Sequence, residues 1–93
     1  MKLISTNTTA TGPSVDVHNR RGLDFVAVST HATVTATTLI EGSMGKDNAG
    51  NAMDWILLAT LADSAGDTVA WFPHMRARVT ANAGVLDADI AGN

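Results

Sequence analysis

The chain has 93 residues, of which 9 are acidic and 6 basic, and its net charge at pH 7 is −3. This length allows one domain with one core, and the absence of cysteine excludes disulfides and thiolate metal sites. The few scattered basic residues cannot form the broad positive surface that nucleic acids require, so nucleic acid is excluded as a partner.

The first thirteen residues, MKLISTNTTATGP, are rich in Thr, Asn, Ser and Gly and end in the turn signal Gly12-Pro13. They lack the apolar core of a signal peptide, and no run of eighteen apolar residues follows, so no membrane partner is expected. We therefore predict two parts: an extended N-terminal arm over residues 1–13 that lies outside the core, and a β-sandwich domain over residues 14–93.

The stretch Leu23–Glu41 is dominated by Val and Thr, which favour antiparallel sheet over helix. Ser14–His18 alternates and predicts a first hairpin with Leu23–Ser29, through a turn over residues 19–22. Thr30-His31 interrupts the pattern. The following strand ends at Glu41, and its alternation assigns to the core side Val34, Ala36, Thr38 and Ile40.

A loop and one ambiguous segment occupy the middle of the chain. Residues 42–52, GSMGKDNAGNA, form a loop longer than a tight turn. Asp54–Leu61 also follows helical spacing, and Asn51 could cap such a helix. Its shortness and the turn signal over residues 63–67 favour a strand, while the helix stays an alternative.

Further short strands are predicted up to the C-terminus. Thr68–Phe72 is stopped by Pro73, a turn covers Ala81–Gly84, and a last strand covers Val85–Ile90. Alternation places inward Met75, Ala77, Val79, Leu86, Ala88 and Ile90. Across the turn we expect Arg76 and Arg78 to pair with Asp87 and Asp89. The whole pattern predicts an all-β fold: a single small antiparallel β-sandwich, jelly-roll-like, of about seven strands.

No group of side chains predicts catalysis or a cofactor, so we expect a non-enzyme with no metal. The histidines lack metal-ligand spacing, no GxSxG elbow is present, and Gly45-Lys46 lacks the rest of a phosphate loop. Four sets of residues were considered and set aside. They are His18, His31 and His74 as metal ligands; Asp24, Ser29 and His31 as a nucleophilic triad; Asp47, Asn48, Asn51 and Asp54 as calcium ligands; and Asp87 and Asp89 as paired catalytic carboxylates.

The order of the pieces TTATGPSVDVHNRRGLDFVAV, ATVTATTLIEGSM, DWILLATLADSAGDTVAWF and MRARVTANAGVLDADIAG resembles small all-β structural proteins of tailed bacteriophages. Glu41-Gly42-Ser43 followed by Trp55 and Leu61 resembles the core hairpin of that family, and residues 75–84 resemble its penultimate strand and turn. The chain departs from the family pattern between Gly42 and Trp55, where a longer loop replaces a short turn.

The resemblance implies a head decoration or cement protein on the outer surface of the virion, made in the cytoplasm of the host bacterium. Its partner would be the major capsid protein, and it would act without enzymatic activity as a homotrimer, with residues 1–13 as the capsid contact. The residues expected to bind the partner are Leu3, Ile4, Thr6, Thr8, Trp71, Phe72, Arg76 and Arg78. Two alternatives remain: a phage tail or fibre component that contacts the host, and a sugar-binding β-sandwich module that stacks sugars on Trp71 and Trp55.

Overall fold

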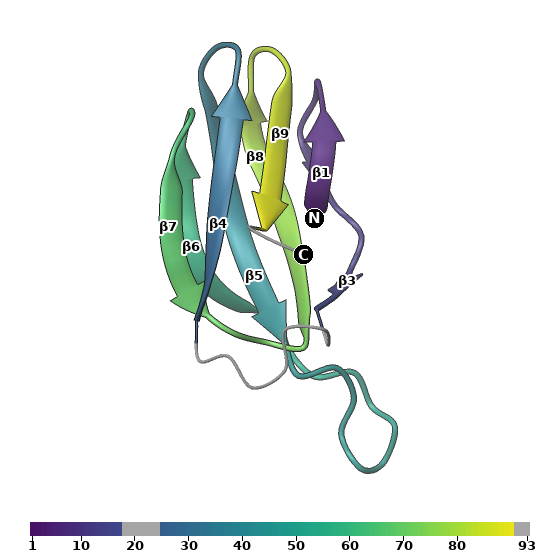
Figure 1. The fold of residues 1–93 in the computed structure, drawn as a ribbon. Coiled ribbons are helices and arrows are strands. Elements are labelled where there is room, and N and C mark those ends of the chain that lie inside the picture. The colour runs from purple at the N-terminus through teal and green to yellow at the C-terminus, as the bar shows by residue number, and fades with distance from the viewer. Residues whose placement is uncertain (18–24, 91–93) are drawn as a thin grey trace.

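The computed structural model describes residues 1–17 and 25–90, and in these ranges the regular structure consists of β-strands (Figure 1). The strands are β1 Lys2–Thr6, β2 Ala10–Thr11, β3 Val15–Asp16, β4 Phe25–Ala32, β5 Ala36–Ser43, β6 Ile56–Ala62, β7 Gly66–Ala70, β8 His74–Asn82 and β9 Leu86–Ile90. The prediction of an all-β antiparallel fold is confirmed. The ambiguous segment Asp54–Leu61 is a strand from Ile56 onward. This part of the chain has no helix that is long and apolar enough to cross a membrane.

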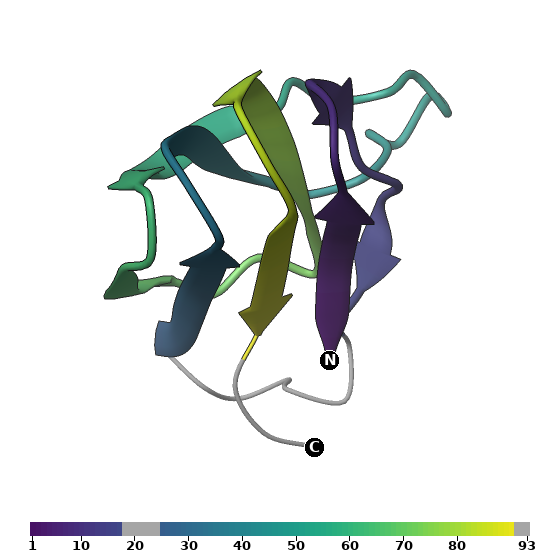
Figure 2. The same cartoon turned by 90° about the horizontal axis from the view of Figure 1, so that it is seen from above.

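The strands form two sheets that lie one over the other (Figure 2). The first, which we call sheet A, has the order β1-β9-β4-β7. The second, sheet B, has the order β2-β8-β5-β6, and the two-residue strand β3 also pairs with β8. Their inner faces enclose an aliphatic core made of Leu3, Val17, Val26, Val28, Ile40, Leu61, Val69, Met75, Ala77, Ala88 and Ile90.

Strict alternation along the strands explains which side chains enter this core, because successive residues of a strand point to opposite faces. The predicted inward sets of the last two long strands are confirmed, since Met75, Ala77, Val79, Leu86, Ala88 and Ile90 are all buried. On β5 the prediction holds for Ala36, Thr38 and Ile40. It is wrong for Val34, which is exposed in the connection before the strand.

The pairings are nested around one hairpin in the middle of the chain. β5 pairs with β6, the strands on either side of them, β4 and β7, pair with each other, and further out β2 pairs with β8 and β1 with β9. Two additional pairings, β4 with β9 and β5 with β8, complete the sheets. The chain therefore runs as one long hairpin whose two arms are wrapped into two layers.

One end of the molecule, which we call the corner end, carries three short connections in addition to residues 7–9, which join β1 to β2. Residues 33–35, 63–65 and 83–85 join β4 to β5, β6 to β7 and β8 to β9, and each crosses from one sheet to the other. The first and last of these form the turns at the top of Figure 1. Each connection has only three residues, so the two sheets are held close together there.

Side-chain hydrogen bonds tie these connections to the strands. The buried Thr30 Oγ1 donates to the Asp63 carbonyl at 2.7 Å and accepts from the Ala65 amide at 3.1 Å. Asp63 has a positive φ of 55°, which Asp tolerates, and its Oδ1 accepts from the Ala36 amide at 2.9 Å. These bonds join the connection over residues 63–65 to both β4 and β5.

Thr33 makes the equivalent link between the first and last connections. Its Oγ1 accepts from the Val85 amide at 2.9 Å, and its own amide donates to the Val85 carbonyl at 3.0 Å. Gly84 lies so close that a Cβ there would be 2.5 Å from Thr33 Oγ1 and from Val34 Cγ2. Only glycine fits at this position without displacing its neighbours.

The predicted N-terminal arm is corrected by the structure. Residues Lys2–Thr6 are an edge strand of sheet A, Ala10–Thr11 pair with β8, and Leu3 is 1% exposed within the core. The Gly12 amide also donates to the Ala77 carbonyl at 2.8 Å. One buried leucine and backbone pairing hold this segment in the fold, although its composition is that of a linker.

Two other strand predictions also differ from the structure. β3 pairs with β8, so Ser14–His18 does not form a hairpin with β4; His18 and the turn predicted over residues 19–22 lie outside the described residues. β4 continues through Thr30 and His31 instead of stopping there. The reason is that the Thr30 side chain is buried and hydrogen-bonded to the corner end, so a polar residue does not end the strand.

Candidate functional site

The hairpin loop, residues 44–55, joins β5 to β6 and projects from the end of the molecule opposite the corner end (Figure 1). It has an internal ladder: the Met53 amide donates to the Gly45 carbonyl at 2.7 Å, and Lys46 and Ala52 form a β-bridge. At the tip, Asp47 Oδ1 accepts from the amides of residues 49 and 51, each at 2.9 Å. The Gly- and Asn-rich segment is thus a loop, as predicted, with a defined conformation.

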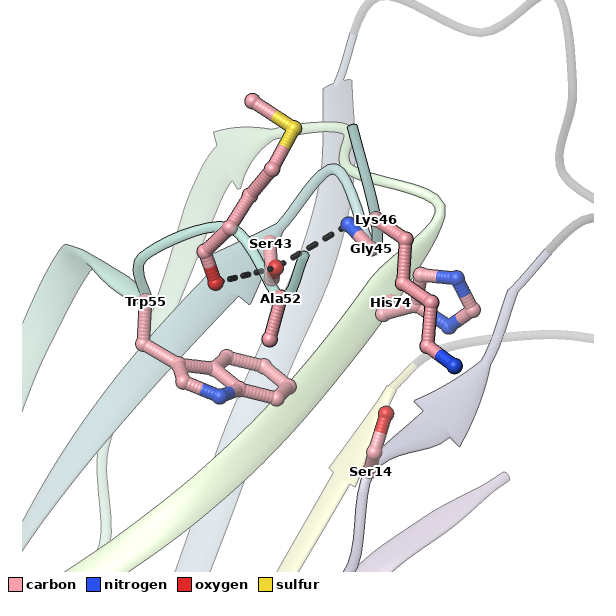
Figure 3. A pocket seen from close by; sticks show the side chains of 8 residues that line it. Ser14, Ser43, Gly45, Lys46, Ala52, Trp55 and His74 are labelled. Atoms are coloured by element: carbon pink, nitrogen blue, oxygen red, sulfur yellow. Dashed lines mark hydrogen bonds between the residues drawn. The ribbon is translucent and has the colours of Figure 1, made fainter. Parts of the chain in front are cut away.

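A pocket of about 490 Å³ lies at the root of this loop (Figure 3). Its lining residues are Ser14, Ser43, Gly45, Lys46, Ala52, Met53, Trp55 and His74. Trp55 stands on one side, Lys46 and His74 stand on the other, and Ser14 lies below the gap between them. The hairpin loop, β3 and the start of β8 thereby bring together side chains that are far apart in sequence.

The buried Ser43 fixes the point at which the loop leaves the sheet. Its Oγ accepts from the Gly45 amide at 3.1 Å and donates to the Met53 carbonyl at 3.4 Å. Gly45 has a positive φ of 99°, which favours glycine, and a Cβ there would meet the His74 ring at 3.0 Å. The loop therefore approaches the His74 ring closely on one side of the pocket.

Trp55 is held by a cluster of charges on the outer face of sheet B. The Arg76 guanidinium lies 4.2 Å from the centroid of the indole, a cation–π contact. Glu41 Oε1 accepts from Arg76 Nε at 2.8 Å, and Glu41 Oε2 accepts from Arg78 at 3.1 Å. Burial alone would raise the pKa of Glu41, but the hydrogen bonds and charges of Arg78 and Arg76 outweigh it and lower that pKa below its usual value.

This cluster corrects the ion pairs expected from sequence. Arg76 and Arg78 do not pair with Asp87 and Asp89, because β8 and β9 belong to different sheets. On sheet A, the Lys2 ammonium instead lies 3.4 Å from a carboxylate oxygen of Asp87 and 3.5 Å from one of Asp89. Glu41 was not expected as the partner because its position opposite Arg76 depends on a register shift in the β5–β8 pairing, where Thr80 is an extra residue in β8.

The N-terminal residues expected to bind a partner are spread over the structure. Leu3 is in the core, so it is not available to a partner, and Ile4 packs against that core. Thr6 and Thr8 lie at the corner end, where their carbonyls accept hydrogen bonds from Asn82 Nδ2 at 3.3 and 3.2 Å. None of these residues lies near the pocket.

Trp71 and Phe72, which were expected to bind a partner, pack against the core of the domain. Trp71 Nε1 donates to the Val17 carbonyl at 3.3 Å, and Trp71 and Phe72 both lie against the main hydrophobic cluster. The Phe72 ring occupies the space above Gly42, where a Cβ would come within 2.7 Å of it. This contact explains the glycine of the Glu41-Gly42-Ser43 sequence. Of the two tryptophans, Trp55 is therefore the one that lines the pocket.

The outer edge of β6 is the second feature of this end of the molecule. β6 pairs only with β5, its residues Ile56–Ala62 include no charged side chain, and Ile56 and Leu57 are 48% and 55% exposed. Three other edge strands of the described chain each carry a charge, namely Lys2 on β1, Asp16 on β3 and Asp67 on β7, whereas the two-residue edge strand β2 carries none. Exposed sheet edges normally carry such charges as protection against strand pairing.

Within residues 1–17 and 25–90, no cluster of His, Asp and Glu is arranged to hold a metal ion. His18 and Asp24, members of two sets considered from sequence, lie outside these ranges. No protein-family model, curated protein or solved structure matches the chain. The pocket, the β6 edge and the strand pairing are the features of the structure that bear on function.

Proposed function

We propose that this chain is a non-enzymatic structural protein of a tailed-phage virion, a decoration or cement protein that binds the outer capsid surface and stabilises the head. The observation that carries the proposal is the nested strand pairing. With β3 set aside, eight strands pair first with last, second with seventh, third with sixth and fourth with fifth. This order supports a jelly roll, an eight-stranded fold used by viral capsid domains. The sequence resemblance of the β5–β6 hairpin supports the same class.

We place the contact with the major capsid protein on the β6 edge and the adjoining hairpin loop. Residues 1–13 are less suited to this role, because Leu3 is buried in the core and the β1 edge carries Lys2, which is paired with Asp87 and Asp89. Ile56 and Leu57 are half exposed, and covering them would contribute about 2 kcal/mol per site. Many equivalent sites on a capsid would each gain this amount, so modest single contacts suffice to stabilise the shell.

A homotrimer belongs to the same proposal. In a closed ring, neighbouring copies cover sheet edges that a monomer leaves open. A core with few aromatic side chains also gains buried surface when copies associate. Trimer formation on the capsid alone is equally compatible with this arrangement.

The proposal is tested by co-sedimentation with capsids that lack the protein, followed by cross-linking mass spectrometry of complete virions. The wild-type protein should sediment with capsids and be present in numbers comparable to the major capsid protein. The double substitution Ile56→Lys and Leu57→Lys should abolish co-sedimentation by placing two charges on the edge.

Val85→Lys is the matched control, because Val85 is 47% exposed at the corner end. It should sediment like the wild type. A few copies cross-linked to tail proteins would support the tail alternative instead, and absence from virions would overturn the virion role. Equal loss of binding in both variants would overturn the assignment to the β6 edge.

A further inference from the structure

Lys46, which lines the pocket, forms no ion pair with a carboxylate in residues 1–17 or 25–90. The other three basic side chains in the described part of the chain form ion pairs: Lys2 with two aspartates, and Arg76 and Arg78 with Glu41. Lys46 forms none with any described carboxylate. An anionic group in the pocket would supply the missing partner, and a charge-assisted hydrogen bond to it would be among the stronger kinds of contact.

Trp55 gives the pocket a rigid aromatic wall. Trp55 is half-buried, Arg76 lies 4.2 Å from the centroid of its ring, and Glu41 fixes Arg76 in turn. Trp55 lines the pocket and Arg76 does not. A ring held in place before binding loses little conformational entropy when a ligand stacks on it.

The remaining side chains favour a compact ligand with hydroxyl groups. Ser14 and His74 lie across the pocket from the indole (Figure 3), and the volume of about 490 Å³ falls in the range of small-molecule sites. The facing backbone groups of Lys46 and Ala52 already pair with each other across the loop, so they are not available to an extended peptide.

From these features we propose that the pocket binds a hexuronate, a pyranose sugar that carries a carboxylate. The carboxylate pairs with the Lys46 ammonium, the C–H face of the ring lies on Trp55, and ring hydroxyls hydrogen-bond with Ser14 and His74. This site can be tested separately from the virion proposal, because sugar binding is measured on the free protein in the absence of capsids.

The test is NMR titration of the full chain with methyl glucuronide, observing the two indole N–H signals. Trp71→Phe assigns them, because it leaves only the signal of Trp55. Methyl glucuronide should shift the Trp55 signal saturably at millimolar concentration and leave that of Trp71 in place. Methyl glucoside, the neutral counterpart, lacks the charge-assisted bond. Its affinity should be lower than that of methyl glucuronide by at least about tenfold.

Lys46→Gln should weaken glucuronide binding by about tenfold. Lys2→Gln removes the same charge on sheet A and should leave it unchanged. Lys46 is exposed, so its substitution does not threaten folding. The proposal is overturned if the Trp55 signal does not move, if glucoside binds as tightly as glucuronide, or if the two lysine variants behave alike. Acetate binding as tightly as glucuronide would also overturn it, because the sugar ring would then contribute nothing.

Discussion

The two ends of the molecule close the same pair of sheets in opposite ways. At the corner end, three-residue connections cross between the sheets and are tied together by the side chains of Thr30, Thr33 and Asp63. At the other end, the hairpin loop joins two neighbouring strands of one sheet and is ordered mainly by its own backbone bonds. A connection that does not cross between the sheets can be longer without disturbing their packing. In this protein the additional residues of the hairpin loop include several that line the pocket.

The largest effect should follow from crowding the corner end with Gly84→Ala. The new Cβ would lie 2.5 Å from two side-chain atoms, one of them the Thr33 Oγ1 that bonds the last connection. We expect the free energy of unfolding to fall by about 2–3 kcal/mol, measured by urea denaturation. Gly66→Ala is the control, since the nearest atom to its new Cβ is 3.5 Å away. An equal loss in both variants would contradict this account of the corner end.

Thr30→Val tests the hydrogen bonds of the corner end without changing side-chain volume. It leaves the Ala65 amide and the Asp63 carbonyl without their hydroxyl partner, and should cost about 1–2 kcal/mol of unfolding free energy. Thr38→Val is the matched control, because Thr38 Oγ1 is buried with no partner among the described residues. That substitution should raise stability by about 1 kcal/mol. Changes of the same sign would show that the hydroxyl bonds do not hold the corner together.

Glu41→Gln tests the charge cluster beside the pocket. Both arginines are partly exposed, so we expect a loss of about 1 kcal/mol at pH 7, measured by urea denaturation. The pKa of Glu41 is lowered in the folded protein, so its stabilising effect is complete above the unfolded pKa of about 4.3 and is lost as the pH falls through the lower folded value. The difference between wild type and variant should therefore shrink below about pH 4.3. A difference that grows in acid would reverse the assigned direction of the shift.

The smallest effect on stability should come from shortening the hairpin loop. Replacing residues 46–52 with the two-residue turn Asn-Gly keeps the β5–β6 pairing and should change the free energy of unfolding by less than about 1 kcal/mol. The same change removes Lys46 and should abolish glucuronide binding. Thermal and urea unfolding check the first expectation, and NMR titration checks the second. Strong destabilisation would mean that the loop end is as essential to the fold as the corner end.

Local patterns in the sequence account for much of the fold. The inward residues of β8 and β9 could be predicted because alternation is a property of each strand alone, and the turn signal after β6 separated strand from helix. The choice of strand partners could not be read in this way. The composition of β1 predicts an arm, and its pairing was not expected because the strand it pairs with, β9, lies at the far end of the chain. In addition, Leu3 is the one leucine of β1 that is buried in the core.

The candidate site was less accessible to sequence reasoning. Arg76 and Arg78 were recognised as outward-facing, but their partner Glu41 comes from a different strand and a shifted register. Trp55 and Lys46 line the same pocket from opposite sides only because the hairpin loop folds back on itself. The one signal that pointed there was the departure from the family pattern between Gly42 and Trp55.

The nested pairing also sets an order for folding. β5 and β6 are joined by a single loop, whereas each outer pair must close a longer stretch of chain, a cost that falls once the inner pair has formed. We therefore expect the β5–β6 hairpin to form first and β1 to dock last. The side of the pocket that the hairpin loop provides would then form early on the pathway, and Ser14 and His74 would complete the pocket when β3 and β8 pair.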